Sequence, residues 1–207
     1  MKEGYWATHK YSRGSVQRDV KQFCGWEFLQ KIIQECSNTK YYRMADSLRK
    51  RDMALVATLF ETGGRISEVL ALDEDNFQIL PERVLVTDMI VVKNKVPTSR
   101  GTFSIKRFEP LCPIMVDWIK QSNSPLFHIT PTRAWQIVND LGKRLEIHIY
   151  DHWFRAQRAS QLASEYDFTL HELLEWFAWK DLRTALRYAR LSWRKLDRKM
   201  DERFIRQ

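Results

Sequence analysis

The chain has 207 residues, enough for one substantial domain, and its 44% of hydrophobic residues allow a sizeable core. Lysine and arginine outnumber aspartate and glutamate by 34 to 26, and the net charge of +8 favours an anionic partner, most often nucleic acid. A merely basic soluble protein is the alternative. Three scattered cysteines without a Cys-x-x-Cys pair argue against a disulfide framework or a zinc site. No uncharged apolar run is long enough to span a bilayer, so we expect a cytoplasmic, DNA-associated protein that has no membrane partner.

The first part of the chain is predicted to be helical after a short arm. Residues 1–14 are polar and aromatic without periodicity, so we expect a flexible N-terminal arm. Apolar residues recur at helical spacing from Ser15 onwards, which predicts a helix with a break near Gly25. A second helix is predicted from about Ala45 to Glu61, and the two glycines that follow it are expected to end it.

The middle of the chain changes its periodicity. Residues 84–108 contain β-branched and alternating segments on either side of the turn KNKVPTSRG. This pattern predicts a hairpin or a small antiparallel sheet with a basic tip. Helical spacing resumes at Pro113, and Thr130 is expected to cap a helix whose first residue is Pro131.

The last third of the chain is predicted to be helical throughout. The segment HWFRAQRASQLASEY reads as a helix, and the next helix opens with a capping box formed by Thr169 and Glu172. Asp181 is expected to cap a short helix, and residues 193–207 carry the apolar stripe of an amphipathic helix. The predicted fold class is therefore mainly α with a small antiparallel β-sheet, an α+β arrangement.

Four residue types along this chain have the chemistry needed to break a phosphodiester bond without a metal. Arginine carries a permanent charge and a planar fork of donors, so two arginines can clamp the charge that develops on the phosphate. Tyrosine can attack the phosphorus once a positive cluster or a base assists it. Histidine can hydrogen-bond the phosphate or take the proton of the tyrosine, and a mobile lysine can protonate the leaving oxygen.

The order of these residues resembles the tyrosine recombinase, or phage-type integrase, family. The match begins at TGGRISEVLAL, which is similar to the family's first arginine box, and continues through VVKNK and HWFR to the T-x-x-x-Y pattern in RTALRY. The resemblance covers most of the chain and implies the fold of the family's catalytic domain. It also implies six catalytic residues, Arg65, Lys93, His152, Arg155, Trp179 and Tyr188, and two supporting residues, Glu68 and Lys95.

Three positions of this match are ambiguous or variable. Lys93 aligns best with the family's catalytic lysine, and Lys95 is the alternative general acid. Trp179 falls at the position of the family's last histidine, where some members carry tryptophan. Gly64 replaces the leucine that usually precedes the first arginine. Taken singly, each catalytic position also has an ordinary explanation, such as a helix cap, a charged strand edge or a core aromatic.

The resemblance implies a site-specific DNA recombinase or integrase of a mobile genetic element. Such an enzyme cleaves and rejoins DNA strands through a covalent 3′-phosphotyrosyl intermediate, and it requires no metal, ATP or other cofactor. Two alternatives are a type IB topoisomerase-like enzyme and a DNA-binding module with a decayed site. Basic residues near the site are expected to contact DNA phosphates, and these are Arg158, Arg183, Arg187 and Arg190.

The expected domain organisation has three parts. An arm at 1–14 precedes a catalytic domain at 15–192. A C-terminal helix at 193–207 is expected to dock on a neighbouring protomer, and packing of its apolar stripe against its own chain is the alternative. There is no room before Ser15 for the family's N-terminal DNA-clamping domain, so we expect a catalytic domain alone. The expected partner is double-stranded DNA, with a monomer in solution and a homo-oligomer, a tetramer, on DNA.

Overall fold

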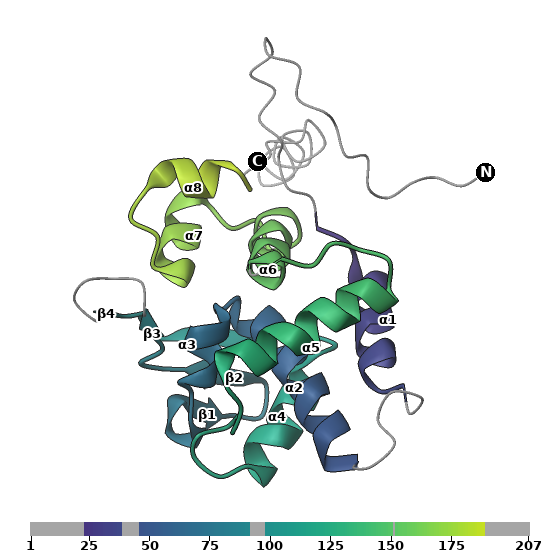
Figure 1. The fold of residues 1–207 in the computed structure, drawn as a ribbon. Helices are drawn as coiled ribbons and strands as arrows, with labels where there is room; N and C mark the ends of the chain where they lie inside the picture. The colour runs from purple at the N-terminus through teal and green to yellow at the C-terminus, as the bar shows by residue number, and fades with distance from the viewer. Residues whose placement is uncertain (1–22, 39–45, 92–97, 151, 189–207) are drawn as a thin grey trace.

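The computed structural model describes residues 23–38, 46–91, 98–150 and 152–188, and Figure 1 shows that most of them are helical. The prediction of a mainly α fold with small antiparallel sheets is confirmed. The expected arm at 1–14 and the expected helix at 193–207 lie outside the described residues.

The helices are α1 (Trp26–Cys36), α2 (Asp46–Thr62), α3 (Ile66–Leu70), the 3-10 helix η1 (Glu74–Asn76), α4 (Cys112–Gln121), α5 (Pro131–Arg144), α6 (Trp153–Ser164), α7 (Leu170–Phe177) and α8 (Leu182–Leu186). The strands are β1 (Phe77–Ile79), β2 (Arg83–Val86), β3 (Ile90–Val91), β4 (Thr98–Ser99) and β5 (Phe103–Lys106).

Helix α2 passes through the core of the molecule. Its last nine residues, from Ala54 to Thr62, are all buried, and it packs against α1, α4, α5 and α6. Beyond its end Gly63 adopts a φ of +57°, the left-handed conformation that glycine takes without steric strain. The sequence-based boundaries are confirmed to within one residue at each end. The glycine turn then leads directly into α3.

Replacing Gly63 by alanine is expected to lower the free energy of unfolding by about 3 kcal/mol. The added Cβ would be forced into a left-handed backbone, and it would also clash with the buried ring of Phe177. Urea titration of both proteins measures the loss. Gly101→Ala is the matched control, because nothing lies within 4 Å of a Cβ added there. Equal losses in the two variants would contradict the expected role of the turn.

A three-stranded antiparallel sheet lies near the region where the sequence predicts a hairpin. Its order is β1-β2-β5, with Phe77 opposite Val86 and Val84 opposite Ile105. Val84, Val86 and Ile105 are buried, because alternate side chains of each strand point to the same face. Strand β1 was not predicted, since three residues are too few to show an alternating pattern.

Strands β3 and β4 form a separate two-stranded ladder at the edge of the molecule, with Ile90 opposite Ser99 (Figure 1). The intervening residues 92–97 lie outside the described part of the chain, and they include Lys93 and Lys95. The ladder agrees with the predicted hairpin. The position of its basic tip remains a prediction.

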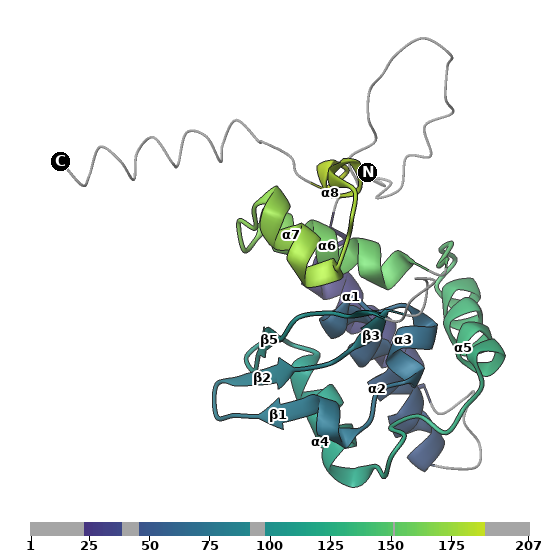
Figure 2. The same cartoon turned by 90° about the vertical axis from the view of Figure 1, so that its left-hand side faces the viewer.

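Helices α6, α7 and α8 lie together at one end of the molecule, above the sheets and α2 (Figures 1 and 2). Helix α6 is buried over eleven of its twelve residues, since it packs against both α2 and α7. Most of the residues that the sequence assigns to the site lie in these three helices, in the segments next to them, or in the glycine turn. No helix in the described ranges has the length and apolar character needed to cross a membrane.

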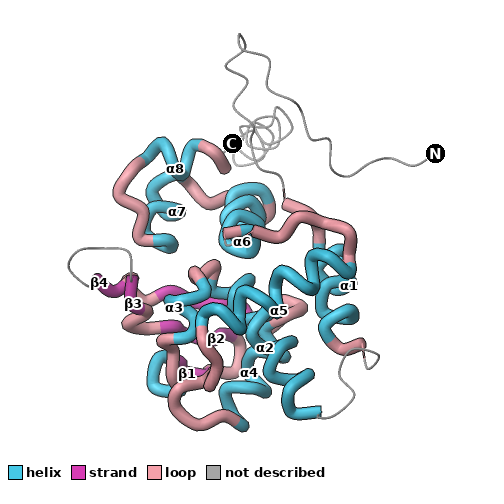
Figure 3. Tube along the Cα trace, in the orientation of Figure 1, coloured by secondary structure: helices cyan, strands magenta, loops and turns pink. Residues whose placement is uncertain are grey.

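The predicted helix caps are confirmed, and they fix where the helices in Figure 3 begin. The side chain of Thr130 accepts from the backbone N–H of Arg133 at 3.2 Å, one residue before Pro131 opens α5. Thr169 begins the capping box of α7, and Asp181 accepts from a backbone N–H at the start of α8. Such caps satisfy N–H groups that have no partner within the helix.

Candidate active site

Arg65 is the residue that follows the glycine turn, and it forms the N-cap of α3. Its backbone N–H donates to Oε2 of Glu68 at 3.0 Å, and its guanidinium donates to Oε1 of the same carboxylate. The Glu68 side chain is fully buried, whereas the Arg65 side chain is 22% exposed. Gly64 is needed beside them, because a Cβ there would approach Val69 Cγ2 to 2.6 Å. The turn therefore leaves the Arg65 side chain partly exposed to solvent, while the buried carboxylate of Glu68 fixes its position by an ion pair.

Arg155 lies on α6 and ties that helix to the same turn. Its Nη1 donates to the carbonyl oxygen of Gly63 at 2.7 Å, and its Nη2 donates to the carbonyl oxygen of Phe177 at 2.7 Å. Nη1 also lies 3.6 Å from Oε2 of Glu68. Burial and the nearby charge of Arg100 hold the pKa of Arg155 well below its usual range, although Glu68 opposes the shift.

A third arginine, Arg100, completes the cluster, and the sequence analysis missed it. Its guanidinium is fully buried, and it donates to Oε2 of Glu68 at 2.6 Å and to the carbonyl oxygen of Thr62 at 2.9 Å. Arg100 follows strand β4 in the segment TSRG, where a basic turn residue would ordinarily face solvent. Its local sequence therefore contains no signal of burial.

The cluster carries more positive than negative charge. Three guanidinium groups surround one carboxylate, which gives these four side chains a net charge of +2. Burial raises the pKa of Glu68, but the charges of the arginines outweigh this effect and bring the pKa below its ordinary value. The buried Nε atoms of Arg65 and Arg100 also lack hydrogen-bond partners. Excess buried charge is costly without a counter-ion, so the cluster is suited to bind an anion.

A ladder of stacked rings connects this cluster to Tyr188. Phe177 stacks on Trp179 at a centroid distance of 4.5 Å, and Trp179 stacks on Tyr188 at 5.4 Å with an interplanar angle of 15°. The guanidinium of Arg155 lies 4.8 Å from the ring of Phe177 and 5.6 Å from that of Trp179. Ala178, with a φ of +48°, turns the chain between the first two rings. The ring of Tyr188 is thereby placed one stacked ring away from the guanidinium of Arg155.

The other predicted catalytic and DNA-binding residues differ in their placement. His152 is the N-cap residue of α6, one turn before Arg155, and its side chain is exposed. Arg183 and Arg187 are exposed on and after α8, as a DNA-contacting role requires. Arg190 lies outside the described residues. The structure thus joins Arg65, Glu68, Arg155, Trp179 and Tyr188 in one chain of contacts.

Arg158 was predicted to contact DNA phosphates, and this prediction was wrong. The residue is only 1% exposed, and its guanidinium pairs with both carboxylate oxygens of Glu109 and with the side chain of Gln161. It also lies over the rings of Phe60 and Trp176, at 5.6 and 5.3 Å from their centroids. Arg158 is therefore enclosed by acidic and aromatic partners within the protein.

Glu61 lies beside Arg158, with its Oε2 3.6 Å from Nη1 of that arginine. Burial raises the pKa of Glu61 well above the ordinary value of 4.5; the charge of Arg158 opposes this shift, and that of Glu109 reinforces it. A carboxyl group whose pKa is higher in the folded state contributes stability at low pH, and this contribution is lost as the pH rises towards the raised pKa.

Glu61→Gln is accordingly expected to raise the melting temperature more at pH 8 than at pH 5. The glutamine cannot ionise, so the cost of a buried charge at high pH disappears, while Arg158 keeps Glu109 as its partner. Thermal unfolding at both pH values measures the difference. Glu175→Gln, at an exposed position, serves as the control. An equal change at both pH values would contradict the raised pKa of Glu61.

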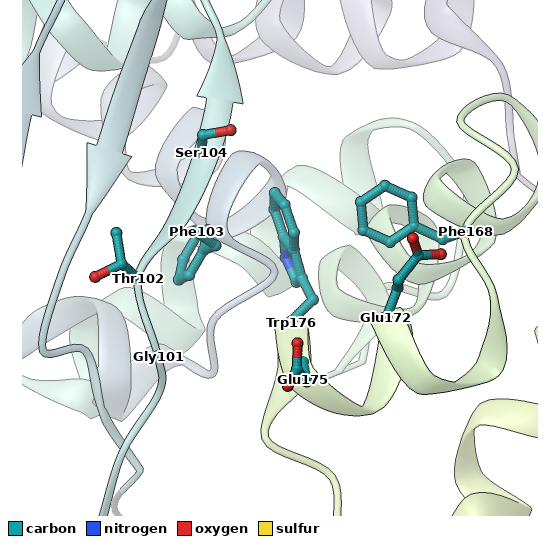
Figure 4. A pocket seen from close by; sticks show the side chains of 8 residues that line it. All are labelled: Gly101, Thr102, Phe103, Ser104, Phe168, Glu172, Glu175 and Trp176. Carbon is teal, nitrogen blue, oxygen red and sulfur yellow. The ribbon is translucent and has the colours of Figure 1, made fainter.

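The pocket in Figure 4 is separate from the arginine cluster. It has a volume of about 450 Å³, lies between residues 101–104 and helix α7, and is bordered by the exposed carboxylates of Glu172 and Glu175. Two carboxylates would repel a phosphate, so this pocket is not our candidate site. Within the residues that the structure describes, no group of three or more His, Cys, Asp or Glu side chains is placed to hold a metal ion.

Comparisons with known proteins identify the family and the fold. Residues 22–194 match the model of the phage integrase family. The fold is similar to the XerH site-specific recombinase bound to difH substrate, with a TM-score of 0.62 and 18% identity over 84% of this chain and 52% of that one. It is also similar to the catalytic domain of bacteriophage HP1 integrase, with a TM-score of 0.55 and 20% identity over 81% and 86% of the two chains.

A third similar structure is the Tn1549 transposon integrase in complex with transposon right end DNA, with a TM-score of 0.58 and 14% identity over 88% and 66% of the two chains. The present chain spans about half the length of the XerH chain. No curated protein matched the sequence. Since the family match extends from before α1 to beyond α8, the chain belongs to the phage integrase family of tyrosine recombinases.

Proposed function

We propose that this chain is the catalytic part of a site-specific recombinase that cleaves and rejoins DNA through a covalent bond to Tyr188. One observation carries the proposal: a cluster of three arginines with a net charge of +2 lies one stacked ring away from the tyrosine. The cluster offers the charge that a phosphodiester needs, and Tyr188 offers the nucleophile. The similar XerH recombinase is bound to difH substrate and the similar Tn1549 integrase is in complex with transposon right end DNA, which supports DNA as the substrate.

In the proposed reaction, the scissile phosphate lies against Arg65 and Arg155. The phenolic oxygen of Tyr188 forms a bond to phosphorus while the bond between phosphorus and the 5′ oxygen breaks, and the electron pair leaves with the 5′ oxygen. His152 is our candidate to take the tyrosine proton, and Lys93 or Lys95 is our candidate to protonate the 5′ oxygen. The phosphotyrosyl bond retains the energy of the broken bond, so the 5′ hydroxyl of another strand can reverse the step without ATP.

The arrangement of protomers and the outer DNA contacts belong to the same proposal. Arg183 and Arg187, together with Arg190, would contact neighbouring phosphates and contribute a strongly salt-dependent part of the affinity. The chain would be monomeric in solution and tetrameric on DNA. Residues 193–207 would dock on a neighbouring protomer in that assembly.

Covalent trapping tests the proposed function. The protein is incubated with labelled, nicked duplexes of randomised sequence in the presence of EDTA, and products are resolved on a denaturing gel. We expect a labelled adduct whose modified peptide contains Tyr188, because arginines rather than a metal supply the charge. Absence of any adduct would favour a DNA-binding module, and loss of the adduct in EDTA alone would contradict the metal-independent reaction.

A second assay separates the two enzymatic alternatives. Supercoiled plasmid and paired duplexes that carry the trapped sequence are treated in parallel with the same protein. Strand exchange between the duplexes supports a recombinase. Relaxation of the plasmid without strand exchange would support a type IB topoisomerase-like enzyme instead.

A further inference from the structure

Arg100 links the β3–β4 ladder to the centre of the site. Its backbone N–H donates to the carbonyl oxygen of Met89 at 2.9 Å, which fixes the residue just beyond β4. Its guanidinium reaches the end of α2, where it donates to the carbonyl oxygens of Thr62 at 2.9 Å and of Gly63 at 3.4 Å. The same group donates to Oε2 of Glu68 at 2.6 Å. One side chain thus connects the hairpin, the glycine turn and Glu68.

Arg100 cannot itself contact a phosphate at the surface of the site. Its side chain is 0% exposed, and its guanidinium lies about equally far from two aromatic rings, 6.0 Å from Phe103 and 5.9 Å from Phe177. Any effect on the reaction must therefore pass through the groups that it touches. Among these groups, Glu68 is the one that also holds Arg65 and lies close to Arg155.

We propose that Arg100 is a positioning residue, which neutralises Glu68 so that Arg65 and Arg155 remain available to the scissile phosphate. This inference rests on the proposed function. With Arg100 in place, Oε2 of Glu68 is occupied at 2.6 Å, and Arg155 stays 3.6 Å from that oxygen and donates to two carbonyls instead. Without Arg100, Oε2 keeps only the backbone N–H of Arg65 as a close donor and can draw Arg155 towards it, and the net charge of the cluster falls from +2 to +1.

A charge-compensating double variant tests this assignment in a single-turnover cleavage assay with nicked duplex. Arg100→Met should slow cleavage by about tenfold to a hundredfold, the effect expected when a residue that orients a reacting group is lost. Glu68→Gln combined with Arg100→Met restores the net charge of +2. The double variant should therefore cleave about tenfold faster than Arg100→Met alone, as coupled neighbours do. A double variant no faster than Arg100→Met would overturn the proposal.

A neutral substrate provides a second measurement, which a purely structural role would not change. A methylphosphonate at the scissile position replaces one non-bridging oxygen by a methyl group and removes the charge that the arginines neutralise. The difference in rate between the wild type and Arg100→Met should shrink to less than about threefold on this substrate. If Arg100→Met loses the same factor on both substrates, Arg100 supports only the fold and the proposal fails.

Arg158→Met is the matched control, because Arg158 is equally buried and pairs with a carboxylate outside the cluster. Arg158→Met should lose the same factor in rate on both substrates. If the rate loss of Arg158→Met also shrinks on the methylphosphonate, the measurement is not specific to the arginine cluster, and the role assigned to Arg100 is contradicted. Melting temperature and DNA affinity are measured for each variant. If Arg100→Met does not fold, Arg100→Gln replaces it in both assays.

The conservative variant and the wild type complete the design. Arg100→Lys keeps the charge beside Glu68, so it should cleave the phosphate substrate about tenfold faster than the neutral variant. Equal rates for lysine and the neutral residue would overturn the proposal while leaving the proposed function intact. A wild-type protein that forms no adduct on any duplex would overturn both.

Discussion

Tyr188→Phe is expected to abolish covalent attachment to DNA while leaving the affinity for DNA almost unchanged. The substitution removes only the phenolic oxygen, which is the proposed nucleophile. The phenylalanine ring can keep the stacked position on Trp179, now 5.4 Å between centroids, so the end of α8 should not rearrange. Denaturing gels of labelled nicked duplex measure the adduct, and fluorescence anisotropy of the same duplex measures the affinity.

Tyr166→Phe is the control for this substitution, because Tyr166 is a second tyrosine that lies close to a buried arginine, Arg158. Burial and the charge of Glu109 raise its pKa above the ordinary range, which makes it a poor nucleophile. The adduct should therefore persist in Tyr166→Phe. If the adduct survives in Tyr188→Phe and disappears when Tyr166 is also replaced, the nucleophile is Tyr166 and not Tyr188.

Arg155→Ala is expected to slow single-turnover cleavage by about a hundredfold or more, the loss seen when a donor to transition-state charge is removed. Arg65→Ala should have an effect of the same order. Arg155 also donates to the carbonyls of Gly63 and Phe177, so its removal takes this donor from the Phe177 carbonyl and leaves the Gly63 carbonyl with the longer bond from Arg100. Melting temperatures are therefore measured alongside the cleavage rate, with the duplex at saturating concentration.

Arg155→Lys separates charge from geometry at this position. Lysine keeps the charge but cannot donate to both carbonyls and a phosphate through a planar fork, so we expect a rate between those of alanine and the wild type. Arg49→Ala is the surface control, because Arg49 pairs with Asp46 at the start of α2. A wild-type cleavage rate in Arg155→Ala would remove this residue from the proposed mechanism.

The local features of this fold were predictable from the sequence. Helix α2 and its glycine stop, the Thr130 cap with Pro131 and the Thr169 capping box all depend on residues within a few positions of one another. For such features the residues that form the sequence pattern are the same residues that make the stabilising contacts. The resemblance of the arginine box, HWFR and RTALRY to the family's motifs likewise pointed to residues that the fold brings into contact.

The features that sequence analysis missed depend on partners far along the chain. Arg158 is a basic residue on a helix, and nothing near it indicates that Glu109 will enclose it from a segment 49 positions away. Arg100 is separated from Glu68 by 32 positions and follows a basic turn. Charge patterns alone assign such arginines to the surface, because burial of a charge is decided by the tertiary partner that neutralises it.

The burial of α6 along almost its whole length affects how mutational-scanning data on this protein should be interpreted. Most substitutions in Trp153–Ser164 will be depleted in any selection for function, because nearly every side chain of the helix is enclosed. Depletion will reflect packing at Ala156, ion pairing at Arg158 and the proposed phosphate chemistry at Arg155. Two parallel selections, one for DNA binding and one for cleavage, resolve these causes. Arg155→Lys is the kind of variant that should pass the first selection and fail the second.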